Sequence, residues 1–184
     1  MPFSSESGKA FIRAVVADIA SKIDHSPFNV LDVGAGSGGY LARYSDLLPS
    51  HMCRWYAIEA WQPYLREYEL EERYHRVFCT DVRQYVRCLS YPGYPQHVGI
   101  CFLGDIVEHM SKEDALLVIQ ELLKVSTTVI ISIPIVHWPQ DAYAGNPYER
   151  HIKDDWSHEE AIASFPSIKG WAIENEIGVY VLGK

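Results

Sequence analysis

The chain lacks any close pair of cysteines. Its four cysteines, Cys53, Cys79, Cys88 and Cys101, stand far apart, and none has the Cys-x-x-Cys spacing of a zinc or redox site. Three of them fall within apolar stretches that are typical of buried strands. We therefore predict reduced thiols in a reducing compartment, and we predict no metal ligands.

An excess of positive charge is missing as well. The chain carries 16 Lys and Arg residues against 24 Asp and Glu residues, which gives a net charge of −8. This balance disfavours long-range attraction to nucleic acids and to anionic membranes. A nucleic-acid or membrane partner is therefore not expected.

Long apolar stretches are also absent. The longest, over residues 129–136, is interrupted by Ser132 and Pro134 and is far shorter than the ~20 residues that cross a bilayer. The N-terminal residues contain no apolar core of a signal peptide. A length of 184 residues suits one domain. We expect a single cytoplasmic domain over residues 1–184, with one helix within residues 1–27.

The sequence does contain a regular alternation of short apolar stretches and amphipathic segments. The apolar stretches predict strands at 28–33, 54–59, 75–79, 98–103, 127–133, 170–175 and 179–183. Helical patterns separate most of them, over 37–48, 63–73, 82–89, from 111 onward and from 157 to before Pro166. This alternation indicates an α/β fold, with a doubly wound, mostly parallel sheet, helices on both faces and a late antiparallel pair of strands.

Acidic residues follow four of the predicted strands. Asp32, Glu59, Asp81 and Asp105 each lie at or near a carboxyl end. Ligands of doubly wound sheets bind outside these ends. We therefore expect the four carboxylates to line one edge of the sheet.

A glycine-rich loop over residues 34–39 follows the first strand. Glycine has no Cβ, so a ligand can approach the backbone closely there. The spacing Gly34-x-Gly36-x-x-Gly39, with Glu59 twenty residues after the last glycine, satisfies the fingerprint of NAD-binding enzymes. A nucleotide-type cofactor is therefore expected, and this spacing alone allows NAD.

The same loop also satisfies the looser Gly-x-Gly-x-Gly pattern of S-adenosylmethionine enzymes. Asp32, two residues before the loop, would repel a pyrophosphate but suits the ammonium group of a methionine moiety. Asp81 could accept a hydrogen bond from an adenine amine. These acids favour S-adenosylmethionine over NAD.

At this point the chain resembles a known family. Residues 30–38, Val-Leu-Asp-Val-Gly-Ala-Gly-Ser-Gly, and residues 105–109, Asp-Ile-Val-Glu-His, are similar to two signature motifs of class I S-adenosylmethionine-dependent methyltransferases, in their broad small-molecule subgroup. The resemblance covers residues 28–184 or so. It implies a Rossmann-like, seven-stranded sheet whose last strand is antiparallel. It also implies S-adenosyl-L-methionine as cofactor and S-adenosyl-L-homocysteine as product.

The resemblance further implies roles for single residues. Glu59 would bind the ribose hydroxyls, and the residues after the second and third strands would hold the adenine. The glycine loop would approach the methionine end, and the segment after the fourth strand would lie beside the sulfonium. The cofactor-binding set predicted in this way is Asp32, Gly34, Ala35, Gly36, Gly38, Tyr40, Glu59, Ala60, Asp81, Val82, Gly104, Asp105 and Ile106.

The acceptor side is predicted from two further features. His109 and His137 are candidate general bases, because each follows a strand end and histidine titrates near neutral pH; each could instead only order a loop. The long segment 134–156 is too aromatic for disorder and predicts a lid over the acceptor, with packing on the sheet edge as the alternative. Its predicted acceptor contacts are Trp138, Tyr143, Tyr148 and His151.

The sequence therefore predicts a methyltransferase that acts on an O or N nucleophile of a small molecule or of a protein side chain. Two alternatives remain: a non-catalytic protein that binds S-adenosylmethionine, and an NAD-type oxidoreductase. No motif names the acceptor, and a homodimer is left open.

Overall fold

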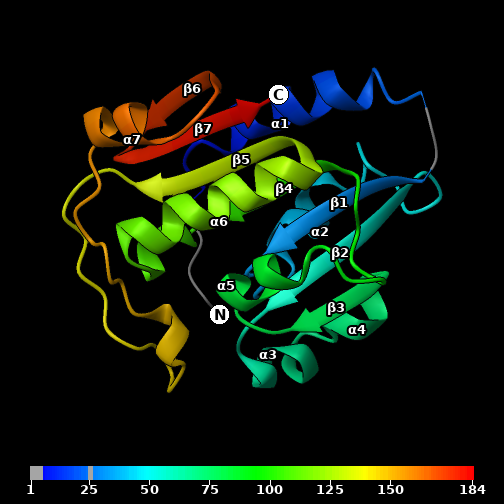
Figure 1. Cartoon of the computed structure of the whole chain (residues 1–184), viewed down its shortest axis with the longest axis horizontal. Helices are drawn as coiled ribbons and strands as arrows, with labels where there is room; N and C mark the ends of the chain where they lie inside the picture. Colours follow the sequence, from blue (N-terminus) through cyan, green and yellow to red (C-terminus); the bar gives the residue numbers. More distant parts are fainter. Residues whose placement is uncertain (1–5, 25–26) are drawn as a thin grey trace.

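The computed structural model of the chain describes residues 6–24 and 27–184 (Figure 1). Seven strands form one sheet. They are β1 (Phe28–Val33), β2 (Cys53–Glu59), β3 (Arg76–Cys79), β4 (Val98–Gly104), β5 (Ser126–Pro134), β6 (Ile168–Glu174) and β7 (Ile177–Gly183). All seven predicted strands are present, and no strand end is shifted by more than two residues.

The strand order is β3-β2-β1-β4-β5-β7-β6. β1 to β5 are parallel to one another, whereas β7 is antiparallel to both β5 and β6. This confirms the predicted Rossmann-like sheet with an antiparallel last strand. The order reverses between β1 and β4, so the carboxyl ends of these two strands mark the switch point where doubly wound sheets bind ligands.

Helices connect the strands and cover both faces. They are α1 (Lys9–Ala20), α2 (Gly39–Tyr44), α3 (Gln62–Glu67), α4 (Leu70–Arg73), α5 (Val82–Tyr85), α6 (Lys112–Val125) and α7 (His158–Ser164). Short 3-10 helices are η1 (Val86–Cys88), η2 (Val107–His109) and η3 (Pro147–Glu149). The predicted helix at 63–73 is split, because Glu69 between α3 and α4 has a left-handed φ of 52°.

Two hydrophobic cores lie on opposite faces of the sheet because side chains alternate along each strand. In β1, Leu31 and Val33 point to the core beneath α5, α6 and α7. Val30 points to the core beneath α1, α2 and α4. The face on which each β1 residue lies therefore decides which helices surround it.

The segment 134–156 leaves β5 and passes the carboxyl ends of the strands, on the left of Figure 1, before it reaches α7. Trp156 anchors its far end, since this side chain is fully buried in the α5–α7 core. Across residues 6–24 and 27–184, no helix has the length and apolar content needed to cross a lipid bilayer.

All four cysteines are free. Cys53 and Cys101 are buried in β2 and β4, as the apolar pattern predicts. Cys79 is exposed, because β3 is the edge strand of the sheet.

Candidate functional site

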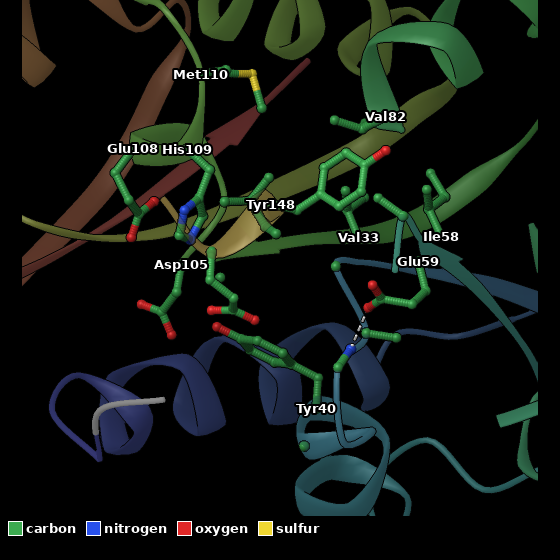
Figure 2. A pocket seen from close by; sticks show the side chains of 18 of the residues that line it. Val33, Tyr40, Ile58, Glu59, Val82, Asp105, Glu108, His109, Met110 and Tyr148 are labelled. Atoms are coloured by element: carbon green, nitrogen blue, oxygen red, sulfur yellow. Dashed lines mark hydrogen bonds between the residues drawn. The ribbon is translucent and has the colours of Figure 1, made fainter. Parts of the chain in front are cut away.

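A cavity of about 280 Å³ lies at the carboxyl ends of β1, β2, β4 and β5 (Figure 2). The glycine loop, the residues after β2 and β3, the start of α1 and part of the 134–156 segment form its walls. It coincides with the switch point between β1 and β4. Most of the predicted cofactor-binding residues line it: Gly34, Ala35, Gly36, Tyr40, Glu59, Ala60, Asp81, Val82, Gly104, Asp105 and Ile106.

Glu59 is the carboxylate that the backbone holds most firmly at this cavity. Its Oε2 accepts a hydrogen bond from the Gly36 amide at 2.8 Å, drawn in Figure 2, and its Oε1 accepts one from the Trp61 amide at 2.8 Å. Burial raises the pKa of Glu59, and these two amides oppose the shift. Each oxygen keeps a second lone pair, so the carboxylate can still accept from a ligand hydroxyl.

Two glycines of the loop lie against side chains of the protein, so that neither position has room for a Cβ. A Cβ at Gly34 would lie 2.0 Å from Cδ1 of Ile106, and Gly34 has a φ of +67°. A Cβ at Gly38 would meet the Arg73 guanidinium at 2.5 Å, and Gly38 does not line the cavity. A side chain at either position would therefore collide with the protein itself, although Gly34 also lines the cavity.

Asp32 does not border the cavity, contrary to its predicted contact with the cofactor. It lies on the same face of β1 as Val30, so its carboxyl points into the α1, α2 and α4 side of the sheet. Tyr74, just after α4, donates a hydrogen bond to Asp32 Oδ2 at 2.6 Å. Burial raises the pKa of Asp32 to about 7. Asp32 is thus a buried neighbour of the cavity and not part of its wall.

Lys9, at the start of α1, lines the cavity and was missed by the sequence pattern. Its side chain is buried, and its Nζ donates a hydrogen bond to the Tyr40 hydroxyl at 3.1 Å. Burial lowers the pKa of Lys9, and the nearby Asp105 carboxylate opposes this. The sequence could have shown that Lys9 is buried, because it shares a helix face with the buried Ile12 and Val16, at spacings of three and seven residues.

Asp81 has two structural roles at the cavity wall. Its Oδ1 accepts from the Arg83 amide at 2.7 Å and so caps α5, and its Oδ2 accepts from the Arg83 guanidinium at 2.6 Å. Burial alone would raise the pKa of Asp81, but the hydrogen bonds from Arg83 outweigh it and the pKa is lowered. The carboxylate is therefore ionised and held in place beside Val82.

The segment after β4 turns sharply into the cavity. Asp105 has a left-handed φ of 55°, and η2 follows it with Glu108 and His109 on the cavity side. His109 Nδ1 lies 3.1 Å from the Arg150 carbonyl oxygen, and burial lowers the pKa of His109 to about 4. Its ring is therefore neutral at pH 7. Burial raises the pKa of Glu108 well above its ordinary value, and Asp105 adds to this shift.

The 134–156 segment supplies the remaining wall. Trp138, Tyr148 and His151 line the cavity, together with Glu149. Hydrogen bonds between backbone groups hold the segment together, for example from the Trp138 amide to the Asp154 carbonyl at 2.7 Å. The segment thus reaches the cavity instead of packing only on the sheet edge.

Two predicted acceptor-side residues do not line the cavity. The His137 side chain is 69% exposed and lies 3.7 Å from the Asp154 carboxylate. Tyr143 is exposed near the tip of the segment. Strand-end position alone could not show this, because the chain turns away from the cavity between Pro134 and Trp138.

The cavity is acidic. Among the described residues, its wall holds five acidic side chains against three from lysine or arginine: Glu59, Asp81, Asp105, Glu108 and Glu149 against Lys9, Arg43 and Arg83. Such a wall favours a ligand with positive charge and opposes a pyrophosphate.

No model of a known protein family matches the chain, and no curated protein sequence matches it. Solved structures do resemble it. The N-terminal domain of EvdMO1 with S-adenosylhomocysteine bound is 12% identical, with a TM-score of 0.62 over 97% of this chain and 80% of that one. An S-adenosylmethionine-dependent methyltransferase from Clostridium acetobutylicum is 14% identical, with a TM-score of 0.61 over 94% of this chain and 92% of that one.

A third similar structure is the mitomycin 7-O-methyltransferase MmcR, which is 12% identical with a TM-score of 0.58. The match covers 97% of this chain and 59% of that one. With its strand order and its antiparallel β7, the chain has the Rossmann-like fold of class I S-adenosylmethionine-dependent methyltransferases.

Proposed function

We propose that the chain binds S-adenosyl-L-methionine in this cavity and transfers its methyl group to an O or N nucleophile of a small-molecule acceptor. One observation carries the proposal. In a methyltransferase fold, the carboxylate at the end of β2, Glu59, faces the cavity and is held there by the amides of Gly36 and Trp61.

The cofactor's adenosine would lie against the ends of β2 and β3. Glu59 would accept hydrogen bonds from the ribose hydroxyls, while Ala60 and Val82 would contact the adenine. Asp81 would accept from the adenine amine, although Arg83 already occupies part of its hydrogen-bonding capacity. This arrangement keeps the roles implied by the sequence resemblance for these four residues.

The methionine part would lie between the glycine loop, Tyr40 and the start of α1. Lys9 would pair with the cofactor carboxylate, because it is the buried ammonium group at this wall. The acidic residues around it would favour the positive sulfonium and ammonium groups. Asp32 would not contact the cofactor, since it is separated from the cavity.

Methyl transfer is an in-line displacement at the sulfonium carbon, so the protein's task is to align the acceptor and to exclude water. The acceptor would lie between Asp105 and the lid side chains Trp138 and Tyr148. A hydroxyl acceptor must lose a proton. Of the two predicted bases, His109 lines the cavity and is neutral at pH 7, whereas His137 does not line it.

The strand order, the short α2 and the acidic cavity wall all disfavour an NAD-type oxidoreductase. NAD-binding sheets have the order 3-2-1-4-5-6 and place a pyrophosphate at a helix N-terminus. Here an antiparallel strand is inserted between β5 and β6, and α2 after the glycine loop has only six residues. The carboxylates of Asp105 and Glu149 would add repulsion.

The remaining alternative is a non-catalytic protein that binds the cofactor. A transfer assay separates it from an enzyme: S-adenosylmethionine with a labelled methyl group is incubated with the protein and with fractionated small-molecule extracts. We expect label in a small product with the wild type, and at least ~10-fold less with the Glu59→Ala variant at a cofactor concentration well below its Kd. Binding of the cofactor without transfer to any fraction would contradict the catalytic part of the proposal.

A further inference from the structure

Glu108, His109 and His151 come together at one end of the cavity. Figure 2 labels Glu108 and His109 on its left, whereas Glu59 lies on its right. Each of the three residues offers one ligand atom, and these atoms all lie within 4.8 Å of one another. The sequence separates His151 from His109 by 42 positions, so only the fold creates this group. We propose that Glu108, His109 and His151 form a binding site for one divalent transition-metal cation.

Each of the two imidazoles has one ring nitrogen paired with a backbone carbonyl, which leaves the other nitrogen for a ligand. His109 Nδ1 lies 3.1 Å from the Arg150 carbonyl oxygen, and His151 Nδ1 lies 2.6 Å from the Trp138 carbonyl oxygen. A carbonyl only accepts hydrogen bonds, so each Nδ1 carries the proton and each Nε2 keeps its lone pair. Metal-binding histidines use this same pairing of the far nitrogen with a carbonyl or carboxylate.

Glu108 supplies a carboxylate that needs a positive partner. The residue is 2% exposed, and its Oε2 has no hydrogen-bond partner within residues 6–24 and 27–184. A buried oxygen of this kind is costly unless it is paired or coordinates an ion.

The backbone fixes the relative position of the three ligands. The Glu108 carbonyl accepts hydrogen bonds from the Ile152 amide at 2.8 Å and from the Lys153 amide at 3.0 Å. These bonds dock the segment around His151 onto η2, and the two histidine rings meet with their centroids 4.9 Å apart. Bonds of about 2.1 Å place two ligand atoms at most ~4.2 Å apart, so binding requires only a small contraction of the group.

The ligand types decide the class of cation. Two imidazole nitrogens and one carboxylate suit Zn²⁺, Co²⁺, Mn²⁺ or Fe²⁺, whereas Mg²⁺ prefers oxygen ligands. Three protein ligands leave coordination positions open, as in catalytic metal sites. Because the group lines the cavity, an open position would face its interior.

A further consequence rests on the proposed methyltransferase function. An acceptor oxygen on the cation would lose its proton more easily, because a bound divalent ion lowers the pKa of a coordinated hydroxyl. The ion would use the His109 Nε2 lone pair that a general base needs. The two roles of His109 therefore exclude each other.

The test is a titration of the apo protein with Co²⁺ in the absence of any nucleoside. Calorimetry and the visible absorption of the bound ion measure the binding. We expect one Co²⁺ per chain. The His151→Ala and Glu108→Gln variants should bind Co²⁺ at least ~10-fold more weakly. His137→Ala is the matched control, because His137 lies in the same segment but outside the group, and it should bind as the wild type does.

Thermal unfolding with and without Co²⁺ shows whether a variant that binds weakly is still folded. Co²⁺ should raise the midpoint of the wild type and of His137→Ala, but not that of His151→Ala. The proposal fails if the wild type binds no Co²⁺, Zn²⁺ or Mn²⁺, or if His151→Ala binds Co²⁺ unchanged. It also fails if Mg²⁺ binds more tightly than Co²⁺, or if a thiolate band places the ion on a cysteine. Binding of S-adenosylhomocysteine, measured separately with a chelator present, distinguishes failure of this site from failure of the proposed function.

Discussion

Tyr74 donates a hydrogen bond of 2.6 Å to the Oδ2 of Asp32, across 42 positions of sequence. This contact links the end of α4 to the strand before the glycine loop. The other oxygen, Oδ1, has no partner in the described part of the chain. The acid that the sequence motif assigned to the cofactor is therefore held by a tyrosine inside the protein.

The first prediction concerns the pH dependence of stability at Asp32. Burial raises its folded pKa to about 7 from the ordinary 3.8, against the opposing Tyr74 hydrogen bond and with Glu59, Lys9 and Arg73 nearby. The folded state thus holds the proton more tightly, so this contribution to stability is complete below pH ~4 and is lost as pH rises through 7. The Asp32→Asn variant should unfold with a free energy ~1–3 kcal/mol higher than the wild type at pH 8, with no gain at pH 4.

Urea denaturation at several pH values measures this difference. Asp46→Asn is the control, because hydrogen bonds from Arg13 lower the pKa of this exposed carboxyl. Its substitution should change stability in the opposite direction, and only above the pKa of Asp46. A wild type that is more stable than Asp32→Asn at pH 8 would show that Asp32 is ionised and favourably paired.

Lys9 gives a prediction about the methionine end of the cofactor. Lys9→Met should weaken binding of S-adenosylhomocysteine ~10-fold, because one hydrogen bond to a charged group is lost. It should leave 5′-methylthioadenosine unaffected, since that compound lacks the amino and carboxyl groups. Lys22→Met is the matched control, because Lys22 is exposed and pairs with Asp18. If Lys9→Met weakened the binding of S-adenosylhomocysteine and of 5′-methylthioadenosine equally, Lys9 would not contact the amino-acid end of the cofactor.

Alanine substitutions at Gly34 and Gly39 compare a glycine that is tightly packed with one that has open space around it. Gly34→Ala would press on Ile106 at 2.0 Å and would force alanine to a φ of +67°. We expect a loss of ~1–3 kcal/mol in the free energy of unfolding. Gly39→Ala meets no atom within 4 Å and should be nearly neutral. Similar losses in the two variants would contradict the packing described for the loop.

Substitutions in the 134–156 segment should affect binding of the methyl acceptor but not binding of the cofactor. Trp138→Ala and Tyr148→Ala should raise the KM for the methyl acceptor found in the transfer assay. Both should leave the affinity for S-adenosylhomocysteine within ~2-fold of the wild type. Tyr143→Ala is the control, because Tyr143 is exposed and does not line the cavity. An unchanged KM in the first two variants would mean that the segment does not cover the acceptor.

Local sequence pattern was enough to predict the sheet. Each strand is a short apolar stretch, and alternation with helical segments predicts a mostly parallel, doubly wound sheet. The family resemblance implied its antiparallel last strand. The late pair followed from a tight turn, now seen between Glu174 and Ile177. Strand-end position likewise placed Glu59, Asp81 and Asp105 on one cavity, because parallel strands end at one edge.

Features that depend on side-chain direction or on distant partners were not predictable in this way. Asp32 follows the alternation of β1 to the face of Val30. Its partner Tyr74 directly follows α4, a helix that the sequence showed only as part of a longer one. Lys9 lies at the edge of an amphipathic pattern, where a charged residue is usually solvated. The meeting of His109 and His151 depends on the path of a long segment and on its docking to Glu108.

The most direct test of the proposed function is calorimetry of the wild type and of Glu59→Ala with S-adenosylhomocysteine and with NAD⁺. Glu59 accepts from Gly36 and Trp61 and faces the predicted ribose site. We expect the wild type to bind S-adenosylhomocysteine and not NAD⁺, and Glu59→Ala to lose at least ~10-fold in affinity. Binding of NAD⁺, or unchanged binding of S-adenosylhomocysteine by Glu59→Ala, would contradict the account.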